Sequence, residues 1–458
     1  MASPDILARY AEFEQALTQL IGPVRFRAET NMRLERMTHL LELLDNPQQT
    51  YPLIHIGGTA GKGSTAAMAA AILTAAGYRT GLHLSPPLQI LNEGYHINQQ
   101  IVSTSRLIAC LNAIQPAITE VATSNPYGAA TFFEAQVALA LYLFQQEAVD
   151  VAVVEVGLGG TTDATNVVPA VVSVITNIGF DHTDILGHTI ASITEAKAGI
   201  IKPGQQVISG VQQIEAQQII AQRCAAQGAR LWQLGSEFDY TWADDGSLDL
   251  RVPGYTCDQV RPAMPGRMQG ANAACAMAAV IALPQVTSGM AAIRQGIGTL
   301  QLPGRMEVVQ ECPLVVLDGA HNADKLQAAA EALQPLMVNR RCIVVFALKS
   351  GKLVADLLPT LLAGTDMLIV TTFRVRDLWT PTDPQQLAIA VAALAPDCPL
   401  HVIADPLEAL MFALSTATPD DLILVTGSLY LVGDVRAHWY PVRELLEQAE
   451  RYNAGTLQ

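Results

Sequence analysis

We predict from the sequence an α/β protein with a larger N-terminal and a smaller C-terminal domain, and three observations support this fold class. The chain has 458 residues, 50% of them hydrophobic, which is more than one compact core usually holds. Nearly continuous Val- and Ile-rich runs alternate with helical spacing, as in a mostly parallel sheet covered by helices on both faces. The alternation starts afresh after residues 302–305, so we expect domains over residues 1–300 and 301–458.

The N-terminal domain is expected to begin with helix and then to alternate strands with helices. Residues 4 to about 44 have helical spacing, which Asp45-Asn46-Pro47 interrupts. Residues 205–260 are more irregular and polar, with a β-element expected near residues 238–252. The other expected elements are strands at residues 53–56, 149–156 and 171–178, and helices at residues 64–76 and 135–147.

The C-terminal domain repeats this alternation on a smaller scale. Short apolar runs predict strands at residues 314–317, 342–346, 367–370, 401–403 and 422–425. Segments of helical spacing lie between them, for example at residues 323–333 and 385–394. The sequence therefore predicts a second α/β domain of a common domain size.

The composition excludes several kinds of partner and site. The formal net charge is −15 and the pI is about 5.0, so we expect no nucleic-acid or membrane partner. The seven Cys are scattered and form no C-x-x-C, which disfavours metal clusters and a disulfide framework. The N-terminus lacks a basic segment before an apolar core, and the most apolar helical stretch, residues 66–76, is too short to span a bilayer. We therefore expect a cytoplasmic protein.

The segment Gly58-Thr59-Ala60-Gly61-Lys62-Gly63-Ser64-Thr65 lies between an expected strand and an expected helix, which is the context of a phosphate-binding loop. Glycines let backbone N–H groups converge on phosphate oxygens, while the helix N-terminus and Lys62 add positive charge. The hydroxyl of Ser64 or Thr65 is available to Mg²⁺. Gly63 separates Lys62 from Ser64, so the loop departs from the strict Walker A pattern. The alternative is a glycine-rich turn without a ligand.

Glu155 closes an apolar strand and precedes a second glycine-rich segment, Gly157-Leu158-Gly159-Gly160. Ligands of open α/β sheets bind at the carboxyl ends of the strands, so we expect this carboxylate beside the phosphate-binding loop. A carboxylate in that place suits Mg²⁺. The alternative is a solvated glutamate followed by a flexible loop.

Asp181-His182-Thr183-Asp184 follows another apolar strand, and His182 is a candidate ligand of a metal or of a substrate. A single His after a strand is more often a satisfied polar residue, but three strands that deliver polar groups at one edge argue against coincidence. Lys197 gives a weaker signal, since a lysine on a helix usually lies in solvent. In the C-terminal domain, Arg305 and the segment Asp318-Gly319-Ala320-His321-Asn322 are candidates for nucleotide contact, because arginine suits a γ-phosphate.

Together these segments resemble the folylpolyglutamate synthase/dihydrofolate synthase family, within the Mur ligase superfamily. The matching segments occur in the family's order along most of the chain. They are Leu34 to Met37, Gly58 to Thr65, Ser85-Pro86, Asn92-Glu93, Thr131 to Glu134, Glu155 to Asn166, Asp181 to Asp184, Lys197 to Ile200, Leu302 to Arg305, Asp318 to Asn322 and Gly427 to Gly433.

The resemblance implies a fold and a reaction. It implies an N-terminal P-loop ATPase domain of the Mur ligase type and a C-terminal Rossmann-like domain that binds glutamate and closes over ATP. In the implied reaction ATP phosphorylates a carboxylate to an acyl phosphate, which the amine of L-glutamate attacks to form an amide. The implied acceptor is a folate or dihydropteroate, the implied metal is Mg²⁺ in two copies, and the implied assembly is a monomer.

The resemblance also assigns roles to residues of this chain. Lys62, Glu155, His182 and Lys197 would be catalytic, and the metal ligands would be Ser64, Ser85, Glu155, His182 and Lys197, the last as a carbamylated lysine. ATP would contact Thr59, Gly61, Lys62, Gly63, Ser64, Thr65, Asn272, Arg305, Asp318 and His321. The pterin would contact Phe132, Phe133 and Asp163.

Five positions depart from the family's usual residues: Arg33, Ala60, Pro87, Gly94 and Thr161. Most of these changes lie on the acceptor side, where two Arg and one His of the family are missing. A related ligase with a different carboxylate acceptor therefore remains an alternative. A nucleotide-binding protein without ligase activity is a third possibility, against which Lys62, Glu155 and His182 argue.

Overall fold

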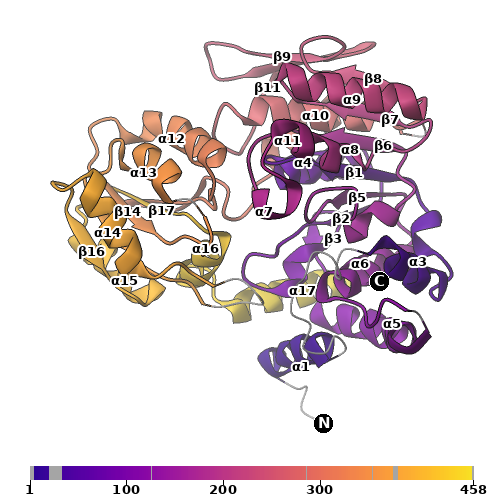
Figure 1. The fold of residues 1–458 in the computed structure, drawn as a ribbon, viewed down its shortest axis with the longest axis horizontal. Helices are drawn as coiled ribbons and strands as arrows, with labels where there is room; N and C mark the ends of the chain where they lie inside the picture. Colours follow the sequence, from indigo (N-terminus) through magenta and orange to yellow (C-terminus); the bar gives the residue numbers. More distant parts are fainter. Residues whose placement is uncertain are drawn as a thin grey trace. The chain divides into compact units, whose positions relative to one another are not determined.

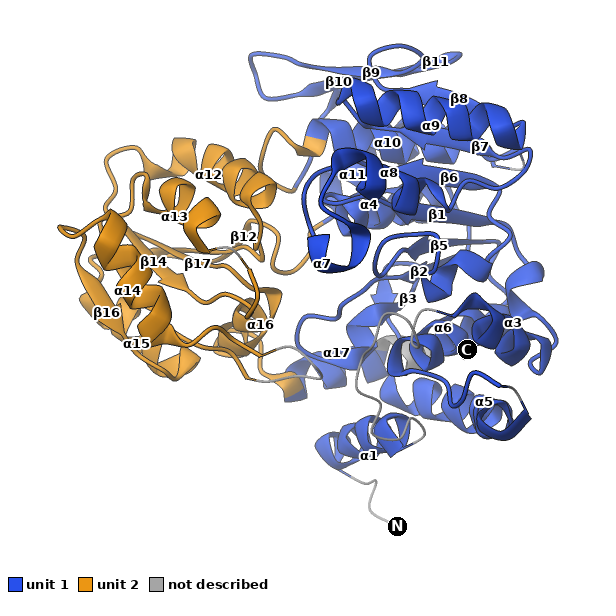
Figure 2. Ribbon diagram, in the orientation of Figure 1, with its two compact units in different colours: residues 1–263, 270–300, 443–458 blue, residues 264–269, 301–442 orange. Residues whose placement is uncertain are grey.

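The computed structural model describes residues 5–19, 33–124, 126–284, 286–352, 354–374 and 380–455 (Figure 1). It divides into two compact units (Figure 2). Unit 1 contains residues 1–263, 270–300 and 443–458, and unit 2 contains residues 264–269 and 301–442. The C-terminal helix therefore belongs to the first compact unit, although it follows the second unit in the sequence.

The main sheet of unit 1 has eight strands within the described residues, in the order β4-β3-β2-β5-β1-β6-β7-β8. From β2 to β8 neighbouring strands are parallel, and β3 and β4 are added antiparallel at one edge. The predicted mostly parallel sheet is thus confirmed. The strands are β1 (Leu53–Gly57), β2 (Thr80–His83), β3 (Tyr95–Ile97), β4 (Gln100–Ile101), β5 (Val151–Glu155), β6 (Val172–Ile175), β7 (Gln206–Ser209) and β8 (Arg230–Gln233).

Helices cover both faces of this sheet. The crossovers β1-α4-β2 and β2-α6-β5 run in opposite directions along the sheet, so right-handed connections place α4 and α6 on opposite faces. The longer helices are α1 (Ile6–Gln19), α3 (Leu34–Glu42), α4 (Lys62–Ala75), α5 (Thr104–Ser124), α6 (Phe132–Gln146), α8 (Ile190–Ala198), α9 (Ile214–Gln227), α10 (Gln269–Ile281), α11 (Met290–Thr299) and α17 (Val442–Gly455). The short ones are α7 (Thr183–Leu186) and the 3₁₀-helices η1 (Pro47–Gln49), η2 (Leu91–Gly94) and η3 (Ala164–Val167). None of the helices within the described ranges is both long and apolar enough to cross a bilayer.

Several predicted boundaries in unit 1 were wrong, each for a local reason. Helix α6 begins at residue 132 rather than 135, because the Thr131 side chain accepts from the Glu134 amide and starts the helix. Strand β6 ends at residue 175 rather than 178, because Thr176 and Asn177 turn toward the phosphate loop. The predicted helical segment 4–44 contains α1 and α3, while its residues 4 and 20–32 lie outside the described part of the chain.

The segment predicted as irregular is more regular than expected. Residues 205–233 form β7, α9 and β8, which extend the main sheet at its edge. Their composition concealed the pattern, since α9 carries four Gln among its fourteen residues and its only large apolar residues are three Ile. The β-element expected near residues 238–252 is confirmed as part of a separate antiparallel sheet, formed by β9 (Asp239–Trp242), β10 (Leu248–Val252) and β11 (Tyr255–Val260).

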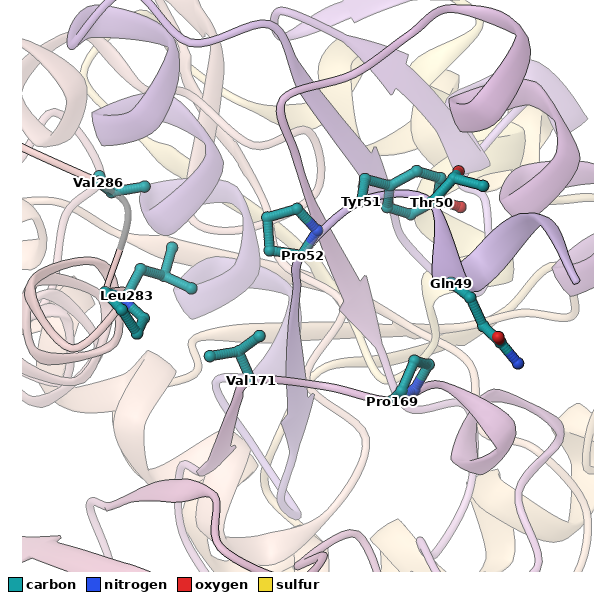
Figure 3. A pocket seen from close by; sticks show the side chains of 9 residues that line it. Gln49, Thr50, Tyr51, Pro52, Pro169, Val171, Leu283 and Val286 are labelled. Atoms are coloured by element: carbon teal, nitrogen blue, oxygen red, sulfur yellow. The ribbon is translucent and has the colours of Figure 1, made fainter.

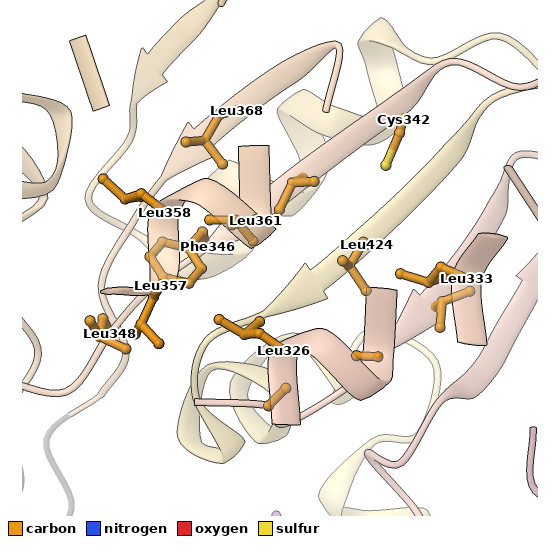
Figure 4. Close-up of a cluster of buried hydrophobic side chains, with 14 of the residues drawn as sticks. Leu326, Leu333, Cys342, Phe346, Leu348, Leu357, Leu358, Leu361, Leu368 and Leu424 are labelled. Carbon is orange, nitrogen blue, oxygen red and sulfur yellow. The ribbon is translucent and has the colours of Figure 1, made fainter. Parts of the chain in front are cut away.

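The described residues of unit 2 form a six-stranded sheet in the order β12-β13-β17-β14-β15-β16, parallel except for β12. Its strands are β12 (Glu307–Glu311), β13 (Leu314–Leu317), β14 (Cys342–Phe346), β15 (Met367–Val370), β16 (Leu400–Val402) and β17 (Leu422–Thr426). Its helices are α12 (Ala323–Met337), α13 (Val354–Leu362), α14 (Pro384–Leu394), α15 (Pro406–Thr416) and α16 (Leu429–Arg436). Leucines of α12 and α13, such as Leu326 and Leu358, pack on Phe346, Leu368 and Leu424 of the sheet (Figure 4). The second α/β domain is therefore confirmed.

Two histidines on the main sheet, His55 and His83, are buried without charge, and burial also lowers the pKa of a third, His96 on β3, to about 4. Burial lowers the pKa of His55 on β1 to about 3, and Lys202 adds to the effect. Burial also lowers the pKa of His83 on β2 to about 4, although the 2.8 Å hydrogen bond between its Nδ1 and Gly94 O acts to raise this pKa. Both side chains are at most 2% exposed. Protonation of either ring therefore opposes the folded state.

We expect this burial to make unit 1 sensitive to acid. The unfolded chain binds protons at His55 and His83 below their ordinary pKa of 6.5, and the folded chain binds them only near their lowered values. Stability is therefore complete above pH 6.5 and falls as the pH decreases toward 4, by about 1.4 kcal/mol per histidine at about pH 5.5. Burial raises the pKa of Asp163, an effect of opposite sign, because protonation of this carboxylate favours the folded state.

Urea unfolding between about pH 7.5 and pH 5.5 measures the effect, with a combined loss of about 3 kcal/mol expected for the two rings. The double variant His55→Gln/His83→Asn keeps one N–H donor at each site and should make the pH profile shallower, with His96 accounting for the slope that remains. The exposed His188, changed to Gln, is the matched control that should leave the profile unchanged. An equally steep profile in the double variant would contradict the assignment.

Candidate active site

The phosphate-binding loop predicted from the sequence connects β1 to α4. Gly58 has φ +141° and Gly61 has φ +79°, a backbone region that favours glycine. A Cβ at Gly58 would lie 2.0 Å from Thr176 Oγ1, and one at Gly61 would lie 2.3 Å from Asn272 Oδ1. Both glycines are therefore required by conformation and by space.

The first turn of α4 presents the groups that a phosphate needs. The helix starts at Lys62, so the amides of Lys62, Gly63 and Ser64 have no acceptor within the helix. Such a helix N-terminus attracts anions, and the Lys62 side chain adds a full charge. The adjacent Thr65 is fully buried, and its Oγ1 lies 3.4 Å from Asn272 Oδ1. Asn272, which was predicted to contact ATP and lies far from the loop in the sequence, is thus next to the loop in the structure.

Glu155 lies where the sequence predicted it, at the carboxyl end of β5 and beside the loop. Its Oε2 accepts the Ser85 N–H at 3.1 Å, and the side chain is only 6% exposed. A Cβ added to Gly63 would lie 3.4 and 3.5 Å from the two carboxylate oxygens, so a side chain at Gly63 would press on Glu155. The first turn of α4, Ser85 and Glu155 therefore meet at one place.

The residues at this place suit Mg²⁺, which prefers oxygen ligands. Ser85 Oγ is buried and has no hydrogen-bond partner among the described residues, although the backbone N–H of the same residue donates to the Glu155 carboxylate. A buried hydroxyl without a partner is costly unless an ion or water satisfies it. The part of the chain that is described holds no cluster of three or more His, Cys, Asp and Glu side chains suited to a metal. The predicted ligand set has only two residues of these types, Glu155 and His182, and depends on hydroxyl groups for the others.

His182 and Lys197 occupy unusual positions. His182 has a left-handed backbone, with φ 51°, directly before α7, and its N–H donates to Asp181 Oδ1 at 3.1 Å. Such strained non-glycine residues cluster at functional sites. Lys197 is only 4% exposed, and its Nζ donates to Gly58 O at 3.0 Å. The lysine thus contacts the phosphate loop rather than solvent, while its carbamylation stays a prediction.

Two of the residues predicted to contact the acceptor, Phe133 and Asp163, lie close to the same glycine. A Cβ added to Gly157 would lie 2.4 Å from the Phe133 ring and 3.1 Å from Asp163 Oδ2, so both border this glycine. Asp163 is 3% exposed and accepts the N–H groups of Leu158 at 2.7 Å and Thr165 at 3.0 Å. Burial raises its pKa, and these hydrogen bonds oppose the shift. Phe132 begins α6 and is half-buried.

Unit 2 brings its own predicted residues together. Asp318, at the end of β13, accepts the N–H groups of Met306 and Ala320, both at 2.9 Å. Burial raises the pKa of Asp318, while the nearby Arg305 guanidinium opposes the shift. His321 Nδ1 lies 2.8 Å from Gly319 O, and its Nε2 lies 3.0 Å from Lys325 Nζ. Arg305, Asp318 and His321 therefore form one polar cluster, whose contact with ATP stays a prediction.

The sequence interpretation missed Thr176 and Asn177, which support the phosphate loop. Asn177 Oδ1 accepts the Ala60 N–H at 2.7 Å and the Thr59 N–H at 3.2 Å. Thr176 Oγ1 donates to Ala60 O at 2.6 Å. The sequence could have indicated these two residues by their position directly after β6. This strand pairs with β1, the strand that immediately precedes the loop.

A separate pocket of about 330 Å³ opens at the opposite ends of the same strands (Figure 3). Pro52 and Val171, which precede β1 and β6, line it together with Tyr51 and Leu283. The Tyr51 hydroxyl donates to Leu141 O and is thereby occupied. The pocket includes none of the predicted site residues, so it is distinct from the candidate active site.

Comparison with known proteins connects this geometry to a family. Residues 56–280 match the family described as the Mur ligase middle domain, and residues 304–429 match the Mur ligase, glutamate ligase domain. The chain is 31% identical over 441 residues to dihydrofolate synthase/folylpolyglutamate synthase of Bacillus subtilis (strain 168). That match covers 93% of this chain and 99% of the relative.

Solved structures agree with the sequence comparison. The Mycobacterium tuberculosis folylpolyglutamate synthase complexed with ADP has a TM-score of 0.87 at 31% identity, over 95% of this chain and 99% of that one. The Yersinia pestis bifunctional folylpolyglutamate synthase/dihydrofolate synthase complexed with AMPPNP and Mn ion has a TM-score of 0.81 at 29% identity, with the same coverage. The chain therefore belongs to the folylpolyglutamate synthase/dihydrofolate synthase family of Mur ligases, and it is an ATP-dependent ligase that forms an amide bond.

Proposed function

We propose that this ligase joins L-glutamate to the carboxylate of a folate or of dihydropteroate. The relatives named above are folate ligases, and the observation that carries the proposal in this chain is the position of Glu155. A carboxylate at the first turn of α4 would repel a phosphate bound there, unless a cation lay between them. Metal-dependent phosphoryl transfer accounts for the presence of both groups.

The proposed reaction has two steps. A carboxylate oxygen of the acceptor takes the γ-phosphoryl group of ATP, which gives an acyl phosphate and ADP. The amine of L-glutamate then attacks the carbonyl carbon, loses a proton, and expels phosphate to leave the amide. Lys62 and the amides of the first turn of α4 would hold the phosphates in position, because such transfers depend mainly on positioning and on stabilisation of charge.

The chain's own residues have distinct parts in this scheme. Mg²⁺ would supply positive charge between the phosphates and the acceptor, held by Ser64, Ser85, Glu155 and His182. We infer a second Mg²⁺ at Lys197 in its carbamylated form. The proposed nucleotide contacts are Thr59, Gly61, Lys62, Gly63, Ser64, Thr65, Asn272, Arg305, Asp318 and His321, and the proposed acceptor contacts are Phe132, Phe133 and Asp163.

One observation favours the alternative of a different carboxylate acceptor. Thr161, where the family usually has Arg, is exposed, and its N–H and its hydroxyl both donate to Ala196 O, at 2.8 and 3.0 Å. A Cβ at Gly199 would lie 2.0 Å from Thr161 Oγ1, so Thr161 packs directly against Gly199. The position thus contributes no cation toward an anionic acceptor.

The test is release of ADP by purified protein with ATP, Mg²⁺ and L-glutamate. Addition of dihydropteroate or of tetrahydrofolate should make ADP release depend on the pterin, with a product heavier by one glutamate in mass spectrometry. Turnover that appears only with another carboxylate would support the alternative acceptor. ATP binding without a product from either pterin or from another carboxylate would contradict the proposed function.

A further inference from the structure

The phosphate-binding loop is held from behind by the segment after β6, residues 176–179. Two loop amides, those of Thr59 and Ala60, donate to a single side-chain oxygen, Asn177 Oδ1, at 3.2 and 2.7 Å. The Thr59 N–H also lies 3.0 Å from the Asn177 backbone O. A residue 117 positions away from Ala60 thus fixes the direction of two N–H groups in the loop.

Further contacts close this junction. Thr59 Oγ1 donates to Gly179 O at 3.1 Å and accepts the Gly179 N–H at 3.0 Å. Thr176 Oγ1 donates to Ala60 O at 2.6 Å. Thr59 and Thr176 are 2% and 5% exposed, so these hydrogen bonds are shielded from water. The junction therefore has little freedom to rearrange when a nucleotide binds.

The junction decides which loop amides are available to a ligand. The Thr59 and Ala60 N–H groups already have an acceptor within the protein, while those at the first turn of α4 have none within the helix. A loop whose inner amides are fixed presents its outer amides without reorganisation, and such preorganisation strengthens binding. The ATP site thus depends on the acceptor oxygen at position 177.

The charge of the side chain at position 177 should affect the binding of ATP. An Asp at position 177 would accept the same two N–H groups equally well, but it would add a negative charge directly behind the phosphate site. A carboxamide accepts them without charge. The neutral side chain therefore supports the loop without repelling a bound nucleotide.

We propose that Asn177 is a positioning residue of the ATP site, which orients the phosphate-binding loop through Thr59 and Ala60 and must be uncharged to do so. This inference rests on the proposed use of ATP at this loop, and it is independent of the identity of the acceptor. The same segment continues along the chain into Asp181 and His182, of which His182 is a proposed metal ligand.

The test compares three variants by calorimetric ATP binding without acceptor and by the KM values for ATP and for the acceptor. Asn177→Asp keeps both hydrogen bonds and should weaken ATP binding at least about tenfold, because like charges this close repel even through a partly aqueous medium. The loss should be larger for ATP than for ADP and should shrink at high salt. Asn177→Leu removes the acceptor and should weaken both nucleotides, with lower thermal stability.

Asn98→Asp is the matched control. Asn98 Oδ1 also accepts a backbone N–H, that of Thr80 at 2.9 Å, but at the amino end of β2, away from the loop. This variant should bind ATP like the wild type. An Asn177→Asp protein with unchanged ATP affinity, or with the KM for the acceptor raised as much as that for ATP, would overturn the inference. Failure of the wild type to bind ATP would overturn both this inference and the proposed function, whereas ATP binding without a folate product leaves the test of Asn177 intact.

Discussion

Replacement of Glu155 by Gln is expected to lower kcat by at least about 10³-fold while leaving the fold in place. Gln has the shape of Glu, and its side-chain oxygen can still accept the Ser85 N–H that Glu155 Oε2 now accepts at 3.1 Å. The variant loses the negative charge, which is the property that a divalent cation requires. The change therefore removes the proposed metal ligand and keeps the local packing.

The measurement is ADP release at saturating substrates, repeated over a range of Mg²⁺ concentrations. A metal role predicts that any remaining activity needs more Mg²⁺ for half-saturation, which a purely structural role would not produce. Glu215→Gln, in the exposed first turn of α9, is the matched control with the same chemical change and should be as active as the wild type. A rate near that of the wild type in Glu155→Gln would refute the assignment.

The strands were the most predictable part of the fold. The runs at residues 314–317, 342–346 and 367–370 coincide with β13, β14 and β15, because uninterrupted apolar runs of this length are typical of strands buried on both faces. Strands β3 and β4 were not predicted. They are two or three residues long and pair antiparallel at an edge of the sheet. Strands this short cannot show a recognisable alternation of apolar and polar residues.

The part of the site that depends only on sheet topology was predictable from the sequence. Lys62 and His182 each follow a parallel strand, Glu155 is the last residue of one, and the carboxyl ends of such strands lie at one edge of the sheet. The contacts that complete the site depend on register and side-chain direction. Asn177 meets the loop because β6 pairs with β1 so that Ile175 lies opposite Gly57, which no local pattern specifies.

A second large effect is expected from a buried ion pair that joins two of the family-like sequence segments. Arg36 on α3 and Glu134 on α6 are 3% and 2% exposed, and the Arg36 Nε and Nη2 donate to the two carboxylate oxygens at 2.8 and 2.9 Å. Arg36 Nη1 also donates to Tyr127 O at 3.0 Å. Arg36→Met leaves the Glu134 carboxylate buried without its cation, so we expect the free energy of unfolding to fall by about 3–5 kcal/mol.

Urea unfolding of the single and double variants separates the pair from its neighbours. Glu134 also binds the Thr131 N–H at 2.7 Å at the start of α6, and Gln can keep that bond. The double variant Arg36→Met/Glu134→Gln should therefore regain much of the stability lost in Arg36→Met. The exposed pair of Arg251 and Asp239 gives the control, since Arg251→Met should change stability by at most about 1 kcal/mol.

The same pair is expected to link stability to the proposed acceptor side of the site. Glu134 directly follows Phe133, whose ring borders Gly157 and the buried Asp163. Loss of the Arg36 contact should therefore raise the KM for the acceptor more than the KM for ATP, because the phosphate loop is held by the separate junction at residues 176–179. Equal stability of Arg36→Met and Arg251→Met would contradict the stabilising role, and equal changes of the two KM values would contradict the link to the acceptor side.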